Sequence, residues 1–239
     1  MARLPRIVIP GLPHQVTRRG NHREQIFLND DDYALYRDLL AEACKLQGVE
    51  VWSWSWSWSW SWCLMPNHLH LILVPNAKDG RGYALGEAHR RYSGFINARN
   101  RQTGHLFQGR FGSVAMNEPH PLAAARYVAL NPVKARLVRK AADWPSSSAR
   151  AHLSGVDDEL VKVKPLLDRI TNFTEFLDST GPPLASAALE RGLSVGRPLM
   201  DAEALKHLEV ELGRSILPAK RGRTQRVLPD GAQCELGDE

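Results

Sequence analysis

Two histidines separated by one residue are the first candidates for chemistry in this sequence. His68 and His70 occur in the run Met-Pro-Asn-His-Leu-His, which continues into the apolar segment 71–74. If residues 68–74 form a strand, side chains alternate between its faces, so both imidazoles project to one side while Leu69 faces a core. Two imidazoles on one face are able to share a metal ion. Isolated pairs of this kind are also common on strands that bind no metal.

A cysteine close to this pair offers zinc as a competing interpretation. Cys63 precedes His68 by five residues. Zinc sites normally use three or four protein ligands at recognisable spacing, and neither a CxxC pair nor an HxxxH pair occurs in the chain. A structural zinc site is therefore disfavoured.

A tyrosine later in the chain is the candidate nucleophile. Tyr127 lies in a segment, 119–130, with the pattern of a helix, and Asn131 follows four residues later, so both side chains fall on one helical face. A helical tyrosine beside valine and leucine is more often part of a core. Asn131 before Pro132 is equally suited to cap the next helix. Taken alone, these residues leave both alternatives open.

The elements that position these residues follow from periodicity and turn signals. An acidic N-cap at 30–32 and apolar residues at helical spacing predict a helix that ends near Gly48. Pro132 disfavours helical backbone in the residue before it, so the helix of Tyr127 should stop near Asn131. The other predicted elements are strands at 14–18, 49–63, 68–74 and within 105–117, and helices at 83–101, from 132, and at 164–178, 184–191 and 201–212.

A tryptophan–serine repeat occupies residues 52–62, and its strict period of two predicts a strand. A strand over 49–63 would run for about 50 Å at roughly 3.3 Å per residue. Strands are usually much shorter, so part of the repeat should bulge or protrude. Each added unit contributes two residues, which keeps His68 on its side of the sheet. Six tryptophans exceed the available core space, so aggregation is a hazard, with base stacking as the functional alternative.

Composition bounds the class of protein. The chain has 239 residues, is 43% hydrophobic and carries a formal net charge of +5, which suits a polyanionic partner without requiring one. Three widely spaced cysteines, Cys44, Cys63 and Cys234, indicate a reducing, cytoplasmic compartment rather than a disulfide framework. No apolar run is long enough to span a membrane. The expected division is a main domain at 1–155, a helical appendage at 156–215 and a basic, disordered tail at 216–239.

Several motifs occur together in a recognisable order. They are 14–21 (His-Gln-Val-Thr-Arg-Arg-Gly-Asn), 65–70, 107–111 (Phe-Gln-Gly-Arg-Phe), 126–135 and Trp144-Pro145. This combination, over roughly residues 5–153, resembles the single-tyrosine HUH transposases. It is most similar to the REP-associated tyrosine transposases, solitary bacterial relatives of the small insertion-sequence enzymes that act on single-stranded DNA. The long Trp-Ser repeat departs from that family, whose members have only a short strand there.

The resemblance implies an α+β fold, a ferredoxin-like domain with a central antiparallel sheet and helices on one face, and a homodimer. It implies that His68 and His70 hold a divalent metal and that Tyr127 is the nucleophile. Asn131 falls where relatives place a third polar ligand, often glutamine. With oxygen ligands from the substrate completing the shell, Mg²⁺ or Mn²⁺ is expected rather than zinc.

The implied activity is cleavage and rejoining of single-stranded DNA hairpins or repeats through a covalent 5′-phosphotyrosine. A non-cutting DNA-binding regulator of repeats and a metal-dependent hydrolase of small substrates are the alternatives, although the hydrolase lacks an evident general base. Arginines are expected to contact DNA phosphates, although each taken singly is more typical of a solvated surface charge. The candidates are Arg18, Arg19, Arg90, Arg91, Arg99, Arg101 and Arg110.

Overall fold

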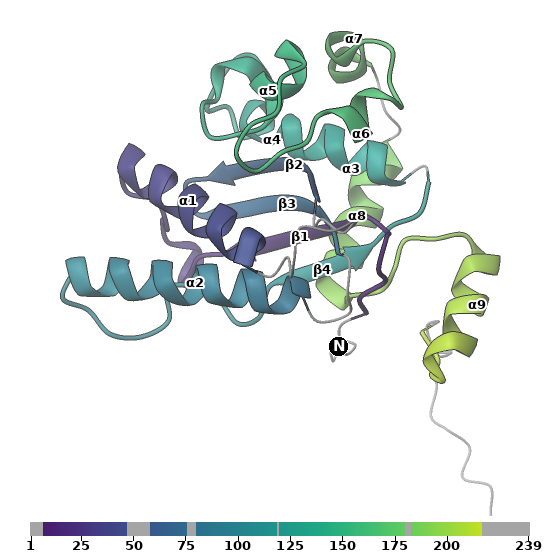
Figure 1. Ribbon diagram of the computed structural model, residues 1–239, viewed down its shortest axis with the longest axis horizontal. Helices are drawn as coiled ribbons and strands as arrows, with labels where there is room; N and C mark the ends of the chain where they lie inside the picture. Colours follow the sequence, from purple (N-terminus) through teal and green to yellow (C-terminus); the bar gives the residue numbers. More distant parts are fainter. Residues whose placement is uncertain (1–6, 47–57, 76–79, 119, 180–182, 217–239) are drawn as a thin grey trace, which may run out of the picture.

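The computed structural model describes residues 7–46, 58–75, 80–118, 120–179 and 183–216 (Figure 1). Its first part has the order strand, helix, strand, strand, helix, strand. These elements are β1 (His14–Arg19), α1 (Asp30–Leu46), β2 (Trp58–Met65), β3 (His68–Val74), α2 (Gly80–Arg99) and β4 (Gly112–Ala115). The strands pair antiparallel in the order β2-β3-β1-β4. This order and pairing are those of a ferredoxin-like fold, so the predicted α+β class is confirmed.

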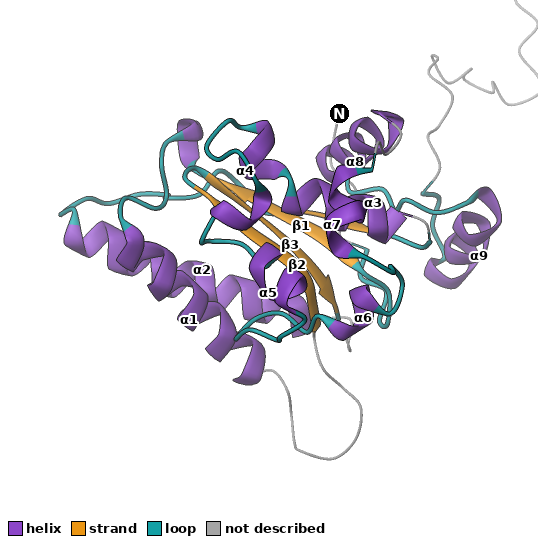
Figure 2. Cartoon of the chain, turned by 90° about the horizontal axis from the view of Figure 1, so that it is seen from above, coloured by secondary structure: helices purple, strands orange, loops and turns teal. Residues whose placement is uncertain are grey.

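Helices α1 and α2 lie side by side on one face of the sheet (Figure 2). Alternate residues of the central strands, among them Val16, Leu69 and Leu71, meet Tyr36 of α1 and Leu85 of α2 in a first hydrophobic core. The alternation along the strand predicted that Leu69 faces a core, and it does. The opposite half of the pattern, which contains the two histidines, is thereby directed to the other face.

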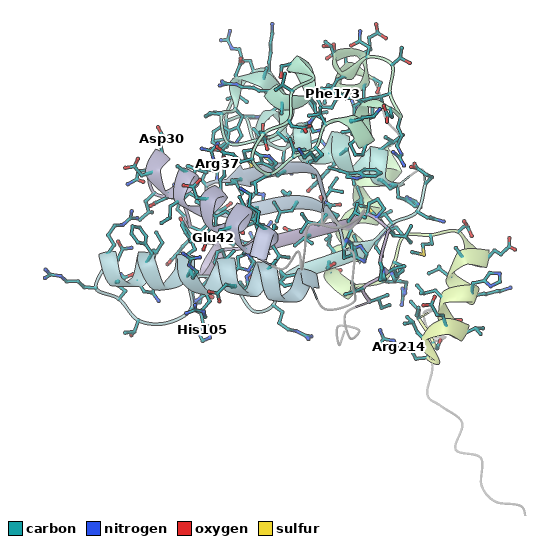
Figure 3. The ribbon with its side chains drawn as sticks, viewed as in Figure 1. Asp30, Arg37, Glu42, His105, Phe173 and Arg214 are labelled. Atoms are coloured by element: carbon teal, nitrogen blue, oxygen red, sulfur yellow. The ribbon has the colours of Figure 1, made fainter. Side chains whose placement is uncertain are left out.

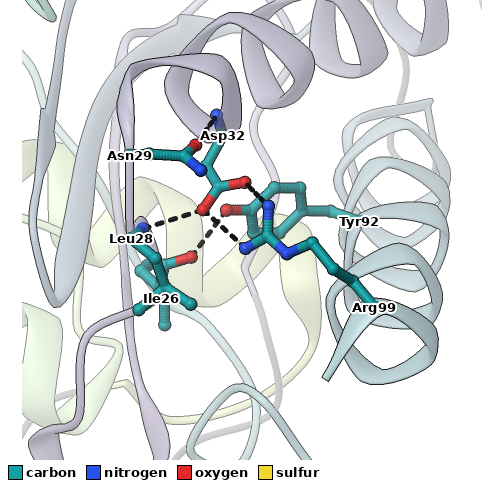
Figure 4. Close-up of polar contacts among 6 residues, drawn as sticks. All are labelled: Ile26, Leu28, Asn29, Asp32, Tyr92 and Arg99. Carbon is teal, nitrogen blue, oxygen red and sulfur yellow. Dashed lines mark hydrogen bonds and ion pairs between the residues drawn. The ribbon is translucent and has the colours of Figure 1, made fainter. Parts of the chain in front are cut away.

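An ion pair joins the start of α1 to the end of α2. The Asp32 carboxylate, whose side chain is 1% exposed, accepts hydrogen bonds from Arg99 at 2.6 and 2.9 Å and from the Leu28 backbone N–H at 2.8 Å (Figure 4). Beside it, the Tyr92 hydroxyl donates to the Ile26 carbonyl oxygen. Burial alone would raise the pKa of Asp32, but Arg99 and the backbone donors hold that pKa below its usual range. This pair stabilises the ionised carboxylate and ties the two helices together.

A second helical layer covers the other face of the sheet, where Ile72 and Val114 pack with Ala124 and Val128. The prediction of helices on one face therefore describes α1 and α2 but is incomplete. Phe173 lies in this layer, stacked on His152 at 4.9 Å between ring centroids (Figure 3). The layer contains α3 (His120–Ala129), α4 (Asn131–Lys134), α5 (Ala149–Ser154), α6 (Lys164–Leu167), α7 (Phe173–Asp178) and α8 (Pro183–Val195).

The C-terminal part of the described chain contacts the sheet closely. Leu189 and Leu193 of α8 are buried in the second core. Leu199 pairs with the outer edge of β4, where its N–H donates to the Ala115 carbonyl oxygen at 2.8 Å. Helix α9 (Ala202–Leu212) lies away from the sheet in both views and packs in a small separate cluster. Of the tail predicted at 216–239, only Ile216 is described, and it is buried in that cluster.

The end of the Trp-Ser repeat forms β2, with an irregularity where a bulge was expected. The register shifts between Ser59 and Ser61, so Trp60 is an extra residue relative to β3. As a result, Trp60 is buried in the second core and Trp62 in the first, although the two have the same parity in sequence. A bulge of this kind absorbs a residue and reverses the faces beyond it. Residues 49–57 of the predicted strand lie outside the described residues.

The β2 edge of the sheet is also partly covered, like the β4 edge. Leu64 of β2 donates its N–H to the Ser146 carbonyl oxygen at 2.9 Å, and Ser148 donates to the Trp62 carbonyl oxygen at 3.0 Å. The Trp144 indole N–H donates to the Leu64 carbonyl oxygen at 3.0 Å.

Among the described helices, none has the length and apolar character needed to cross a membrane.

Candidate active site

The hairpin between β2 and β3 presents the two histidines. Its turn, Pro66-Asn67, is held by the Gly20 N–H, which donates to the Asn67 carbonyl oxygen at 2.8 Å. Gly20 has no space for a side chain, because a Cβ there would overlap the Glu24 carbonyl oxygen. His68 and His70 project from the same face of β3, as the alternation predicted, with ring centroids 5.0 Å apart and ring planes nearly perpendicular.

Helices α3 and α4 bring the tyrosine and the asparagine to this pair. Ala124 and Val128 bury one side of α3 against the sheet, and this packing places Tyr127 beside His70 with 5.4 Å between ring centroids. Asn131, the first residue of α4, lies with its amide nitrogen 3.2 Å from His70 Nε2. All four residues predicted for the reaction centre therefore lie together, although they come from segments about 60 residues apart.

Both histidines are neutral at ordinary pH. Burial is the main cause for each, and it lowers the pKa of His68 to about 4 and that of His70 to about 3. The positive charge of Arg19 lowers both values further, and His68 also lowers the pKa of His70. A neutral imidazole keeps a lone pair on one ring nitrogen, which is the form that binds metals.

The donor set fits a divalent cation. His68 Nδ1 is 2.6 Å from the Asn67 side-chain oxygen, so Nδ1–H donates and Nε2 keeps its lone pair. Metal-binding histidines commonly use the second ring nitrogen in this way. Nε2 of His70 lies 3.2 Å from the amide nitrogen of Asn131, so its lone pair accepts from that amide. Exchange of this hydrogen bond for a cation would make Nε2 of His70 and the Asn131 amide oxygen the further ligands. Three such protein ligands leave coordination positions for substrate oxygen. Nowhere in the described chain, this site included, do three or more His, Cys, Asp or Glu side chains gather to hold a metal, so the third protein ligand here would be the Asn131 amide.

A cavity of about 640 Å³ opens beside His70 and Tyr127. Three of the predicted DNA-binding arginines, Arg18, Arg19 and Arg110, line it. A neighbouring cavity of about 400 Å³ shares Arg18, Gly109 and Arg110 with the first and adds Arg90. The loop with the Phe-Gln-Gly-Arg-Phe motif thus lines both cavities, and three arginines line the cavity that His70 and Tyr127 adjoin.

The remaining predicted arginines are not brought to these cavities. Arg91 forms an ion pair with Glu42 at 2.7 Å, and Arg99 is bound to the buried Asp32. Arg101 lies in the turn that follows α2. Arg90, by contrast, lines the second cavity and pairs with Glu87 on the same exposed helix face, at 2.7 Å. Exposed pairs of that kind are weak, so Arg90 is able to exchange its partner for a phosphate.

Two charged residues beside Tyr127 were missed from the sequence. Glu190 of α8 lines the same cavity, and the Lys134 ammonium lies 4.8 Å from the centroid of the tyrosine ring. Burial raises the pKa of Tyr127, and the negative charge of Glu190 raises it further, whereas Asn131 and Arg19 oppose the shift. Lys134 lies in the motif 126–135, seven residues after Tyr127, a helical spacing that was a local signal. Glu190 had none: it comes from the appendage, 63 residues after the tyrosine, and only the packing of α8 on α3 reveals it.

Comparison with known proteins supports the fold. No protein-family model and no curated protein matches the chain. A solved structure of a REP-associated tyrosine transposase bound to a REP hairpin matches with a TM-score of 0.53 and 21% identity, over 68% of this chain and 92% of that one. This likeness confirms at the level of the fold the resemblance that the motifs predicted. A crystal structure from Deinococcus radiodurans R1, provisionally described as a transposase, matches at 0.34 and 19% identity over 53% of this chain and 95% of that one, which is too low to add support.

Proposed function

We propose that this protein is a single-tyrosine HUH transposase that cleaves and rejoins single-stranded DNA at hairpins or repeats. The observation that carries the proposal is the juxtaposition of Tyr127 with His70, at 5.4 Å between ring centroids, in a cavity lined by arginines. A nucleophile beside paired metal ligands within a positive cavity suits attack on a phosphodiester. The shared fold with a transposase that was solved on a DNA hairpin agrees with this assignment.

In the proposed reaction, Tyr127 attacks the phosphorus of the bound strand. The Oη–P bond forms as the bond from phosphorus to the 3′-oxygen breaks, which yields a 5′-phosphotyrosine and a free 3′-hydroxyl. The phosphotyrosine conserves the energy of the phosphodiester, so a 3′-hydroxyl is able to reverse the step without ATP. Arg19 favours the phenolate that forms on the way, because its charge lowers the pKa of Tyr127.

The proposed metal ligands are His68, His70 and Asn131. When bound, Mg²⁺ or Mn²⁺ stabilises negative charge that develops on the phosphate oxygens. The protein's own contribution is to keep the imidazoles neutral by burial and to keep the ring proton of His68 on Nδ1 through the Asn67 contact. The pairing of β3 with β1 and β2 fixes the separation of the two rings.

For the DNA, we propose that Arg18, Arg19 and Arg110 contact phosphates next to the scissile bond and that Arg90 contacts the strand beyond it. Arg91 and Arg99 already have carboxylate partners and are assigned to the fold instead. A homodimer is retained in the proposal, and sedimentation of the full chain at micromolar concentration tests it.

The deciding experiment traps the covalent intermediate. The full chain is incubated with Mn²⁺ and a panel of labelled hairpin oligonucleotides, and a denaturing gel separates any protein–DNA adduct. We expect the adduct with the wild type, its loss in Tyr127→Phe, and a large reduction in His68→Ala. Tyr33→Phe is the matched control, because Tyr33 packs against Phe27 and Trp144 outside the cavity.

A native gel of the same reactions, which shows non-covalent hairpin binding, separates the alternatives when it is compared with the denaturing gel. An adduct that persists in Tyr127→Phe contradicts the nucleophile assignment. Tight hairpin binding without an adduct, in wild type as in Tyr127→Phe, favours the non-cutting regulator of repeats over the nuclease.

A further inference from the structure

Gln15 is a fully buried glutamine whose carboxamide has no hydrogen-bond partner. The residue is 0% exposed, and both its Oε1 and its Nε2 are unsatisfied. Leaving a buried polar group unpaired costs about 1–3 kcal/mol, so native proteins rarely retain one without a reason. An apolar residue would pack at least as well at this position of the strand. We therefore looked for a hydrogen-bonding group that the Gln15 amide is able to reach.

A second unsatisfied atom lies on the same face of the sheet. Nδ1 of His70 is buried and has no partner, while Nε2 of the same ring faces the Asn131 amide at 3.2 Å. If Nε2 accepts from that amide or binds a cation, the ring proton must reside on Nδ1. The neutral imidazole therefore presents a buried N–H with nothing to receive it.

The strand register makes these two groups neighbours. In the β1–β3 pairing, Thr17 lies opposite His70 and Gln15 lies opposite Ile72. Gln15 and Thr17 point to the same face as His70, and Gln15 is its diagonal neighbour. Diagonal neighbours in antiparallel strands are within reach of a side chain as long as glutamine.

Other residues next to His70 do not offer an acceptor equally well. Cys63 lies opposite it on β2, but the Cys63 thiol donates to the Met65 sulfur at 3.7 Å. Arg19, the other diagonal neighbour, has only donors. Thr17, directly opposite His70, is half-buried and lines the cavity, so its hydroxyl has water as a partner, whereas Gln15 is as fully buried as Nδ1 of His70. Gln15 Oε1 is the acceptor that the geometry favours.

We propose that Gln15 is a positioning residue: when the divalent cation binds Nε2 of His70, the Gln15 carboxamide oxygen, which has no partner in this metal-free structure, accepts a hydrogen bond from Nδ1–H of that ring. The arrangement repeats the one seen at the other ligand, where the Asn67 carboxamide holds Nδ1 of His68 at 2.6 Å. Each ligand histidine then has its own carboxamide, which selects the tautomer and fixes the ring. This inference rests on the proposed function, because it needs His70 to be a ligand.

The test measures metal affinity without DNA and without turnover. Mn²⁺ is titrated into the full chain, and the free ion is followed by electron paramagnetic resonance. Gln15→Met keeps the length of the side chain but removes the amide, so we expect a 10- to 100-fold weaker affinity, as for other partners of metal-bound histidines. Gln15→Glu retains an acceptor and is expected to bind at least as tightly as the wild type.

Two controls separate positioning from a packing defect. Ser113→Ala removes another buried, unpaired polar group from the same sheet, on the face opposite to Gln15, and should leave Mn²⁺ affinity unchanged. The melting temperature of metal-free Gln15→Met should equal or exceed that of the wild type, because an unsatisfied amide is replaced by an apolar group.

The outcomes are distinguishable. If the wild type binds Mn²⁺ and Gln15→Met binds it equally well, the positioning role is overturned while the proposed metal site stands. Equal weakening by Ser113→Ala overturns it as well. If the wild type itself binds no Mn²⁺, both the proposed metal site and the positioning role of Gln15 are overturned.

Discussion

At the residue scale, burial and neighbouring charges decide the protonation states of the candidate site. The histidines are neutral because they are buried beside Arg19, and Tyr127 holds its proton because burial and Glu190 both disfavour the phenolate. These effects act in opposite directions on the reaction. Neutral imidazoles favour metal binding, whereas a protonated tyrosine needs help to become a nucleophile.

Glu190 provides a direct test of this electrostatic description. Glu190→Gln removes a negative charge beside Tyr127, so the pKa of the tyrosine should fall toward its ordinary value. Ultraviolet difference titration of the metal-free protein measures this, with Tyr127→Phe identifying the relevant transition. Glu203→Gln, on α9 away from the sheet, is the control. An unchanged or raised tyrosine pKa in Glu190→Gln would contradict the contact.

Asp32 gives a prediction for stability against pH. Its folded pKa lies below the ordinary value of 3.8, so its stabilising contribution is complete above that value and is lost as pH falls through the folded pKa. Asp32→Asn should lower the free energy of unfolding at pH 7 by about 3 kcal/mol, the lower end for a broken buried pair, since the Arg99 side chain is 32% exposed.

Urea unfolding between pH 2 and pH 7 measures this effect. The deficit of Asp32→Asn relative to the wild type should shrink toward the acidic end. Glu87→Gln, which breaks the exposed pair with Arg90, should leave the free energy of unfolding nearly unchanged, because solvent screens that pair. A deficit that is constant with pH would show that packing, rather than the ion pair, explains the loss.

At the scale of the elements, β2 and β3 form one hairpin that must both absorb the Trp-Ser repeat and place the histidines. The bulge at Trp60 accommodates the irregular end of the repeat, and the pairing from Ser61 to Met65 is then regular up to the turn. The histidines lie beyond this regular segment. Their placement therefore depends on β3 and on the turn, which Gly20 and Ile26 hold by backbone hydrogen bonds.

Deletion of four Trp-Ser units, Trp52–Ser59, tests that independence. Trp60 and Trp62, which are both buried, are retained, and an even number of residues is removed, so the faces of β2 are unchanged. We expect DNA nicking by the shortened chain to equal that of the wild type and soluble yield to be equal or higher. Loss of nicking in a variant that still folds, judged by circular dichroism, would show that the repeat contributes to the site.

At the scale of the whole molecule, the C-terminal part completes the layer that holds Tyr127. Helix α8 packs on both α3 and β4, and the approach is close, since a Cβ on Gly192 would lie 3.1 Å from a Val114 methyl group. The same helix supplies Glu190 to the cavity. The region predicted as an appendage therefore shares a core with the sheet that carries the histidines.

Leu189→Ala tests whether this shared core makes one cooperative unit. The side chain is 1% exposed in the second core, so its truncation should lower the free energy of unfolding by about 2–5 kcal/mol. Denaturant unfolding followed by tryptophan fluorescence and by circular dichroism should move as a single transition. Val210→Ala, at a position 83% exposed on α9, should be neutral. Two separate transitions would instead favour an independent appendage.

The sequence by itself determined the local part of this protein. Helix and strand types follow from periodicity, and the common face of His68 and His70 follows from strand alternation, because both depend only on neighbours along the chain. The four-residue spacing of Tyr127 and Asn131 is local in the same sense. Only the tertiary structure decided that Tyr127 meets His70, that Arg99 serves Asp32 rather than the cavity, and that Glu190 and Gln15 adjoin the site. Those contacts depend on strand register and on the packing of helices distant in sequence, which no local spacing specifies.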